Sequence, residues 1–155
     1  MINPKVTIYT DGSWKGRYKS GGYAAFLTDE YGNYMLIGQG IPDTTIARME
    51  LSAVVVGLSC LNPGCDVIVV ADSMYVVNII NDWISRWITT DFKRIDGSEI
   101  FNRDIIDVLV AQINRMHSVK AIHVKSHTGR KDINSLGNDL CDYYAQYQAD
   151  RLRLA

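Results

Sequence analysis

The sequence lacks a long apolar run, an excess of charge of one sign and a paired set of cysteines. Its most apolar stretch, residues 51–61, is far shorter than the about 20 residues that span a bilayer, which argues against a membrane protein. The 16 lysine and arginine residues are balanced by 17 acidic residues, so overall basicity cannot drive nucleic-acid binding. A locally basic groove is still compatible with this composition. The three cysteines have no zinc-site spacing, which favours reduced thiols in a cytoplasmic protein.

Glutamate is also scarce, since 14 of the 17 acidic residues are aspartate. Aspartate is the poorer helix former and is favoured in caps, turns and metal sites, so each aspartate needs an explanation. A hydrophobic content of 47% excludes disorder, and 12 glycines are too few for collagen. We expect a single domain over residues 1–155, without a secretory leader because a strand pattern begins almost at once.

The first part of the chain predicts three strands and a helix. Residues 5–10 alternate apolar and polar side chains up to Asp11-Gly12-Ser13, and residues 22–28 and 34–39 flank a glycine-containing turn. Thr44 or Thr45 can cap a helix that runs to about residue 60. The valines at 54–56 are also compatible with a strand, but the length of the segment favours a helix.

The second part alternates strands and helices. A continuous apolar run at 67–71 predicts a buried strand, and Ser73 can cap a helix over 74–81. A tryptophan-containing segment over 83–92 follows. We predict further a helix over 100–116, a strand over 121–124 and, after a polar stretch, a helix over 139–154. This order indicates an α/β fold with a mixed sheet and helices on its faces.

Four acidic residues stand where acids are unusual. Asp11 and Asp72 follow apolar strands, at the ends where open α/β sheets bind ligands, and Glu50 and Asp142 have apolar neighbours. Taken singly, each has an ordinary explanation, as a turn residue or a half-exposed helix residue. If all four converge, repulsion of about 1 to 4 kcal/mol per pair at 4 Å calls for a cation, and Mg²⁺ or Mn²⁺ suits oxygen ligands.

Five short motifs occur in an informative order. They are Tyr9-Thr10-Asp11-Gly12-Ser13, Arg48-Met49-Glu50-Leu51, Ala71-Asp72-Ser73-Met74-Tyr75-Val76, Val124-Lys125-Ser126-His127-Thr128-Gly129 and Gly137-Asn138-Asp139-Leu140-Cys141-Asp142. The set resembles type 1 ribonuclease H, in a single-domain bacterial or phage-like form. That family, found also as a domain of retroviral reverse transcriptases, cuts the RNA strand of RNA–DNA hybrids. The resemblance implies a ribonuclease H-like fold, a five-stranded mixed sheet flanked by helices.

The resemblance also implies a metal-dependent endonuclease mechanism. The family's metal ligands fall on Asp11, Glu50, Asp72 and Asp142, whereas Asp139 takes the place of an earlier acid in the pattern. Its mobile catalytic histidine falls on His127, which on its own would be an ordinary loop histidine. Two Mg²⁺ ions about 4 Å apart, replaceable by Mn²⁺, would drive hydrolysis to 5′-phosphate and 3′-hydroxyl products. His117 and His123 belong to no motif, and we interpret them as structural.

Substrate contacts are expected from local charge and from the resemblance. The expected contact residues are Gly12, Ser13, Lys15, Arg17, Thr45, Ser73, Trp87 and Lys93. The cations after Asp11 are equally consistent with a solvated hairpin, and some aromatic residues of 83–92, Trp83 first, are expected in the core. We expect a monomer with an RNA–DNA hybrid as its partner.

The chain departs from the family where Ile46-Ala47 replaces amide residues and Met74 replaces a glutamine. Each departure removes polar contacts with the substrate. Two alternatives therefore stay open. One is a nuclease of the same fold that cuts double-stranded RNA or DNA, and the other is a non-catalytic module that binds hybrids.

Overall fold

A five-stranded mixed sheet forms the centre of the computed structural model, which describes residues 2–152. Its strands are β1 Lys5–Lys15, β2 Ser20–Asp29, β3 Tyr34–Ile41, β4 Asp66–Ala71 and β5 Ser118–His123, in the spatial order β3-β2-β1-β4-β5. β1, β2 and β3 are antiparallel, whereas β4 is parallel to β1 and β5 is parallel to β4. This is the predicted mixed sheet, and the number of strands agrees with the resemblance.

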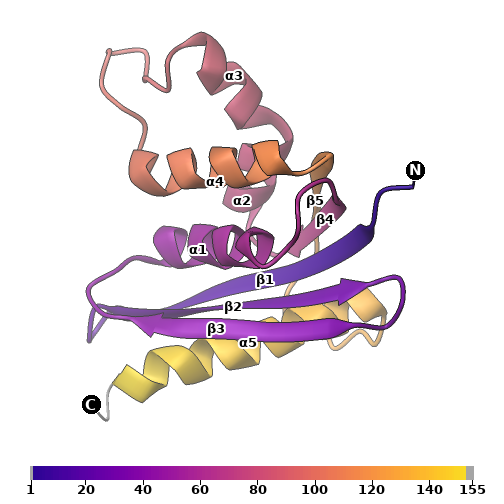
Figure 1. Ribbon diagram of the computed structural model, residues 1–155. Coiled ribbons are helices and arrows are strands. Elements are labelled where there is room, and N and C mark those ends of the chain that lie inside the picture. Colours follow the sequence, from indigo (N-terminus) through magenta and orange to yellow (C-terminus); the bar gives the residue numbers. More distant parts are fainter. Residues whose placement is uncertain (1, 153–155) are drawn as a thin grey trace.

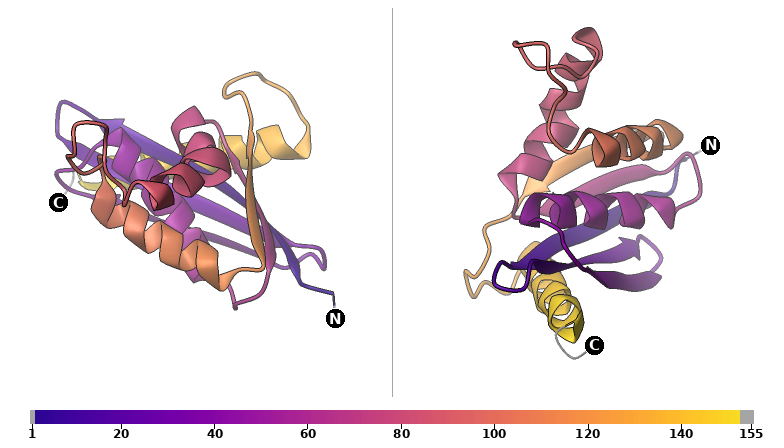
Figure 2. Two further views of the ribbon diagram at one scale, coloured as in Figure 1. Left: turned by 90° about the horizontal axis from the view of Figure 1, so that it is seen from above. Right: turned by 90° about the vertical axis from the view of Figure 1, so that its left-hand side faces the viewer.

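Helices cover both faces of the sheet, as Figure 1 shows. They are α1 Ile46–Ser59, α2 Met74–Asn78, the π-helical segment η1 Ile79–Trp83, α3 Ile84–Thr89, α4 Arg103–Arg115 and α5 Ile133–Arg151. α1, α2 and α4 lie on one face and α5 lies alone on the other, while α3 and the loop after it project away from the body (Figure 2). None of the described helices combines the length and the apolar character that crossing a bilayer requires.

The apolar periodicity of the sequence places two cores, one on each face of the sheet. The larger lies under α1 and α4 and contains Ile8, Leu51, Val69 and Leu109, all fully buried. The smaller lies under α5 and joins Tyr9 and Val70 to Cys141 and Ala145. The strand at 67–71 is thus covered on both faces at Val69 and Val70, as its continuous apolar run predicted. Together the two cores fix α1 and α5 against β1, the strand that carries Asp11.

Two predicted boundaries of the strands and helices near the candidate site are wrong. β1 does not end at Asp11 but continues to Lys15, because the antiparallel partner β2 pairs with it as far as Ser20. The last helix begins at Ile133 rather than at residue 139, because Asp132 caps it by accepting hydrogen bonds from the Ser135 amide and hydroxyl. The polar stretch before residue 139 is therefore largely helical, and the loop after His127 is shorter than the sequence suggested.

Smaller corrections concern the remaining segments. The helix predicted over 74–81 extends as a continuous helical run to Thr89, through η1, and the helix predicted over 100–116 covers Arg103–Arg115. β5 begins at Ser118, three residues earlier than predicted, and ends at His123. All three cysteines are free thiols; Cys65 and Cys141 are buried, whereas Cys60, which caps the end of α1, is exposed.

Candidate active site

The pairing of β1 with β4 brings Asp11 and Asp72 together. The last residue pair of the two parallel strands is Thr10 opposite Ala71, so Asp11 and Asp72 are the next residue on each chain. Neighbouring strands lie about 4.8 Å apart, which puts the two carboxylates side by side where β4 leaves the sheet. The sequence placed both acids at strand ends, and the register makes them neighbours.

Glu50 reaches the same point from α1, because Gly12 allows the helix to approach β1 closely. A Cβ atom at position 12 would lie 2.7 Å from the backbone nitrogen of Glu50, where no side chain fits. One oxygen from each of Asp11, Glu50 and Asp72 lies within 4.8 Å of the others. The side chain of Ser73 hydrogen-bonds with the Glu50 carboxylate as well as capping α2.

Asp142 joins the group from the opposite face, on α5. This helix lies against β1 at Gly137, where a Cβ atom would be 2.4 Å from the ring of Tyr9. A hydrogen bond links the Asp142 and Asp11 carboxyl groups, and Gln146 donates a second hydrogen bond to Asp142 at 3.1 Å. Asp142 is partly buried, whereas Asp139, three residues earlier on the same helix, is exposed.

The cluster carries more negative charge than its surroundings compensate. Burial, followed by the charge of Asp72, raises the pKa of Asp11 to about 9, although the Gly12 amide donates a 2.8 Å hydrogen bond to it. Burial also raises the pKa values of Glu50 and Asp72 above their ordinary range. The largest influences on these three carboxyls are burial, hydrogen bonds and other acidic groups, with His127 acting on Asp72. A site of this composition is suited to a divalent cation with oxygen ligands.

His127 lies at the edge of the cluster on the loop that joins β5 to α5. Its backbone is left-handed, with a φ of 54°, and its side chain is largely exposed. Its Nε2 atom is 3.9 Å from Oδ2 of Asp142, and its charge acts favourably on Asp72. His127 therefore lies close to the acids, on an exposed loop.

The sequence similarity of this chain to known proteins identifies its family. Residues 3–150 match the family model described as RNase H. The chain belongs to the ribonuclease H family. It is 35% identical to the ribonuclease H of a Sulfurovum species over 149 residues, which covers 96% of this chain and 93% of the relative. It is 39% identical to the ribonuclease H of Stutzerimonas stutzeri over 145 residues, which covers 94% of this chain and 91% of the relative. The protein is thus an endoribonuclease of a family that acts on RNA–DNA hybrids with divalent metal ions.

Solved structures agree on the fold. A type 1 RNase H with the type 2 active-site motif superposes with a TM-score of 0.79 at 24% identity, covering 97% of this chain and 74% of that one. A foamy viral protease–reverse transcriptase, solved in complex with dsDNA, superposes with a TM-score of 0.78 at 20% identity, covering 93% of each chain. The resemblance to type 1 ribonuclease H is confirmed.

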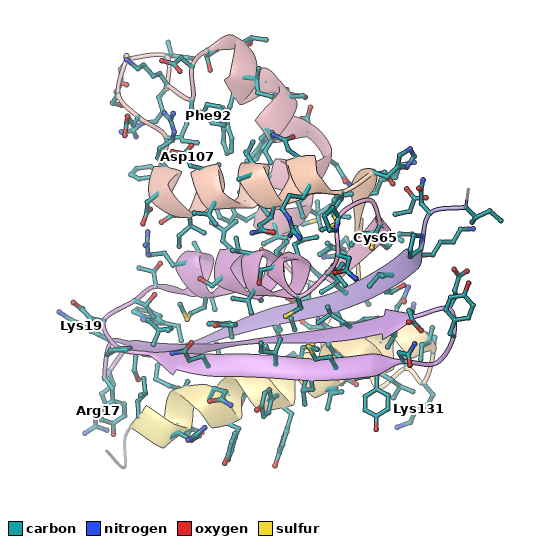
Figure 3. The ribbon with its side chains drawn as sticks, viewed as in Figure 1. Arg17, Lys19, Cys65, Phe92, Asp107 and Lys131 are labelled. Atoms are coloured by element: carbon teal, nitrogen blue, oxygen red, sulfur yellow. The ribbon has the colours of Figure 1, made fainter. Side chains whose placement is uncertain are left out.

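The expected substrate contacts of this ribonuclease H are spread over three regions. Gly12 and Ser13 are within β1, where Ser13 is buried, and Lys15 and Arg17 lead into the exposed β1–β2 hairpin. Figure 3 shows Arg17 and Lys19 together at that end of the molecule. Lys15 also lies 4.0 Å from Asp150 of α5.

Thr45 and Ser73 both use their hydroxyls as helix caps, at the starts of α1 and α2. Thr45 accepts the Arg48 amide hydrogen bond at 3.3 Å and is exposed, so its side chain still faces solvent. Ile46 and Met74, the apolar departures from the family pattern, are exposed next to these caps. Each cap is accordingly followed by an exposed apolar side chain.

Trp87 and Lys93 belong to the projecting segment. Trp87 packs between Trp83 and Phe92, with ring centroids 5.8 and 6.4 Å away, and lines an open groove with Lys93 and neighbouring cations. Trp83 is partly buried against the larger core, as expected. The groove combines aromatic rings with positive charge, and it lies on the helix and loop that project away from the sheet (Figure 2).

Sequence reasoning missed two residues that contact the acids, Gln146, which donates to Asp142, and His123. His123, which belongs to no motif, lies with Nε2 3.2 Å from the backbone carbonyl oxygen of Asp72. Only the pairing of β5 with β4, which sets His123 opposite Ala71, brings it there. By contrast His117 immediately precedes β5, with Nδ1 2.6 Å from Oδ1 of Asp66.

Proposed function

We propose that this ribonuclease H hydrolyses the RNA strand of RNA–DNA hybrids at Asp11, Glu50, Asp72 and Asp142, with two Mg²⁺ ions as cofactors and Mn²⁺ as a substitute. The products would carry a 5′-phosphate and a 3′-hydroxyl. The observation that carries the proposal is the convergence of these four acids from β1, α1, the end of β4 and α5, with three of them within 4.8 Å.

The acids fit divalent ions by their chemistry. All four side chains offer hard oxygen donors, and burial, followed by the charge of Asp72, raises the pKa of Asp11, so that a bound cation would favour its ionised form. When bound, such ions supply an activated water and neutralise the charge that develops on the scissile phosphate. Asp11 and Asp142 would hold the site from one strand and one helix, and Glu50 and Asp72 would complete it.

The remaining residues position substrate and protons. His127, at 3.9 Å from Asp142 and exposed to solvent, is placed to carry a proton to or from the leaving group. The groove at Trp87 and Lys93 would bind one strand through stacking and phosphate contacts, and the Lys15–Arg17 hairpin would bind backbone on the other side. Because the whole site comes from one chain, we further propose a monomer, and the free thiols favour the cytoplasm.

Strand-specific cleavage tests the substrate. A hybrid labelled separately on RNA and on DNA, duplex RNA and duplex DNA would each be incubated with the enzyme and Mg²⁺ or Mn²⁺. We expect cleavage of the RNA strand of the hybrid only. Equal cleavage of the DNA strand, or preferred cleavage of duplex RNA, would support the alternative that exposed Ile46 and Met74 have changed substrate preference. Binding without cleavage would support a non-catalytic module.

A pair of aspartates on one helix tests the ligand assignment. Asp142→Asn should remove nearly all turnover while the circular dichroism spectrum is unchanged, because a carboxylate oxygen of the site is lost. Asp139→Asn is the matched control, since it makes the same change at an exposed position one turn away and should keep wild-type turnover. Full activity in Asp142→Asn, or an equal loss in both variants, would refute the assignment.

A further inference from the structure

The outer edge of β5 is held by one side chain. The Nδ2 atom of Asn81 donates a hydrogen bond to the Ala121 carbonyl oxygen at 2.9 Å, and the Ala121 amide donates one to Oδ1 of Asn81 at 2.8 Å. β5 is an edge strand, so Ala121 has no neighbouring strand on that side. The amide of Asn81 therefore occupies the place of a missing strand and satisfies both backbone groups of one residue.

The π-helical geometry of η1 accounts for this contact. Asn81 lies at the centre of η1, in the helical run that begins at Met74 and continues into α3. A π-turn holds one more residue than an α-turn, so it changes the direction in which side chains leave the helix. This local change coincides with the residue that bridges to β5. Single π-turns inside longer helices occur frequently at functional sites.

β5 leads directly into the loop that carries His127. The Val124 amide donates a 3.0 Å hydrogen bond to the Ala71 carbonyl oxygen, and His123 contacts the Asp72 backbone. Nine residues then separate His123 from Ile133, where Asp132 caps α5. The position of His127 relative to Asp142 thus depends on two anchors, the end of β5 and the start of α5. Asn81 holds the first of these from outside the sheet.

We propose that Asn81 is a positioning residue, which fixes β5 so that the loop presents His127 to the acidic site. The proposal rests on the proposed role of His127. Without the Asn81 amide, β5 would be held only by β4 and by the cores, and His127 would spend less time near Asp142. If Asn81 served only to protect the edge strand from pairing with other chains, the result would differ. Loss of the Asn81 amide would then change association and stability but not turnover per folded molecule.

A double-mutant cycle tests the connection. Steady-state rates on an RNA–DNA hybrid would be measured for Asn81→Ala, His127→Ala and the double variant. We expect Asn81→Ala to lower kcat by about 2- to 30-fold, the range of coupling between connected sites, with little change in KM. In the His127→Ala background the same substitution should lower kcat less than about twofold, because there is no histidine left to position. Equal losses in both backgrounds, or no loss in kcat, would overturn the proposal.

Hydrogen exchange adds a readout that does not depend on activity. In Asn81→Ala the amides of Ala121 and of the loop 124–128 should exchange faster, whereas the amides of β1 should not. Unchanged exchange at Ala121 would overturn the proposal even if kcat fell. Asn114→Ala is the matched control, because Asn114 is likewise an exposed helical asparagine and is not bonded to the sheet.

Two further outcomes separate this inference from the proposed function. Alanine raises helix propensity at an exposed site, so the variant is expected to fold, and Asn81→Gln provides a second variant in which the amide is moved by one methylene. Wild-type kcat in His127→Ala would overturn the proposed role of His127, and this inference with it. A loss in His127→Ala without any loss in Asn81→Ala and Asn81→Gln would overturn this inference alone.

Discussion

Replacing Asp11 by asparagine should stabilise the metal-free protein while it removes activity. Asp11 is 5% exposed and lies among three other carboxyl groups, so without metal the folded chain keeps this carboxyl protonated at a pH at which the unfolded chain would ionise it. Asparagine has nearly the same shape but carries no charge. The substitution therefore removes the free-energy cost of keeping this carboxyl protonated and leaves the packing of β1 against α1 and α5 in place. A residue placed for function would then be a cost to stability.

The size and the sign follow from the pKa of Asp11. It is raised from 3.8 to about 9, so between these pH values the unfolded chain releases a proton that the folded chain retains. Stability of the metal-free protein therefore falls as the pH rises from about 4 to about 9. At about 1.4 kcal/mol per pH unit the cost at pH 7 is on the order of 4 kcal/mol. Because an asparagine amide must also find partners, we expect Asp11→Asn to recover about 2 to 4 kcal/mol.

Urea unfolding in the presence of a chelator, at several pH values between 4 and 8, measures this difference. The advantage of Asp11→Asn should be small near pH 4 and grow with pH, and millimolar Mg²⁺ should narrow it by stabilising the wild type. Asp29→Asn is a control of opposite sign, because the pKa of Asp29 is lowered by hydrogen bonds from Asn33 and Tyr31 and its removal should destabilise the turn. A metal-free Asp11→Asn that is less stable than the wild type at pH 7 would refute the reasoning.

Two further substitutions test the approach of α1 and the basic groove. Gly12→Ala should lower the free energy of unfolding by about 1 to 3 kcal/mol and reduce turnover, because the new Cβ atom would displace the Glu50 backbone. Thermal melting and rate assays measure the two effects. Gly16→Ala is the control, because its methyl group would first meet the Trp14 ring. Lys93→Ala should leave the melting temperature unchanged but weaken hybrid binding and reduce its salt slope by about 1, and an unchanged slope would remove Lys93 from the substrate contacts.

Helix and strand boundaries that depend on neighbouring residues were predictable from the sequence. Boundaries that depend on contacts with distant residues were not. Thr44 or Thr45 was expected as a cap because capping involves only its own helix, and it is the Thr45 side chain that accepts the Arg48 amide hydrogen bond. The start of α5 was placed too late because Gly137-Asn138 looks like a loop signal. Gly137 is in fact required in mid-helix, where only glycine fits against the ring of Tyr9. From the sequence alone, a glycine required by a contact with a distant residue cannot be distinguished from a glycine required by a turn.

The candidate site was predictable in its members but not in its supports. The four acids follow from ordered motifs, and the pairing of Thr10 with Ala71 gives the physical reason why two of them meet. The hydrogen bond from Ser73 to Glu50 and the contact of His123 with Asp72 join residues that no sequence spacing relates. Such contacts depend on how the helices and strands pack against one another, and the periodicity of a single helix or strand does not predict this packing.

The pairing of β1 with β4 also determines where the chain tolerates added length. Asp11 and Asp72 are far apart along the chain, yet the register of β1 and β4 determines the distance between them in space. One residue inserted within 67–71 would turn Asp72 to the other face of the sheet, since side chains alternate. A tag placed in the exposed turn at 30–33, by contrast, would leave the register unchanged. This turn is therefore the place to attach a fluorophore or a surface anchor for following single cleavage events.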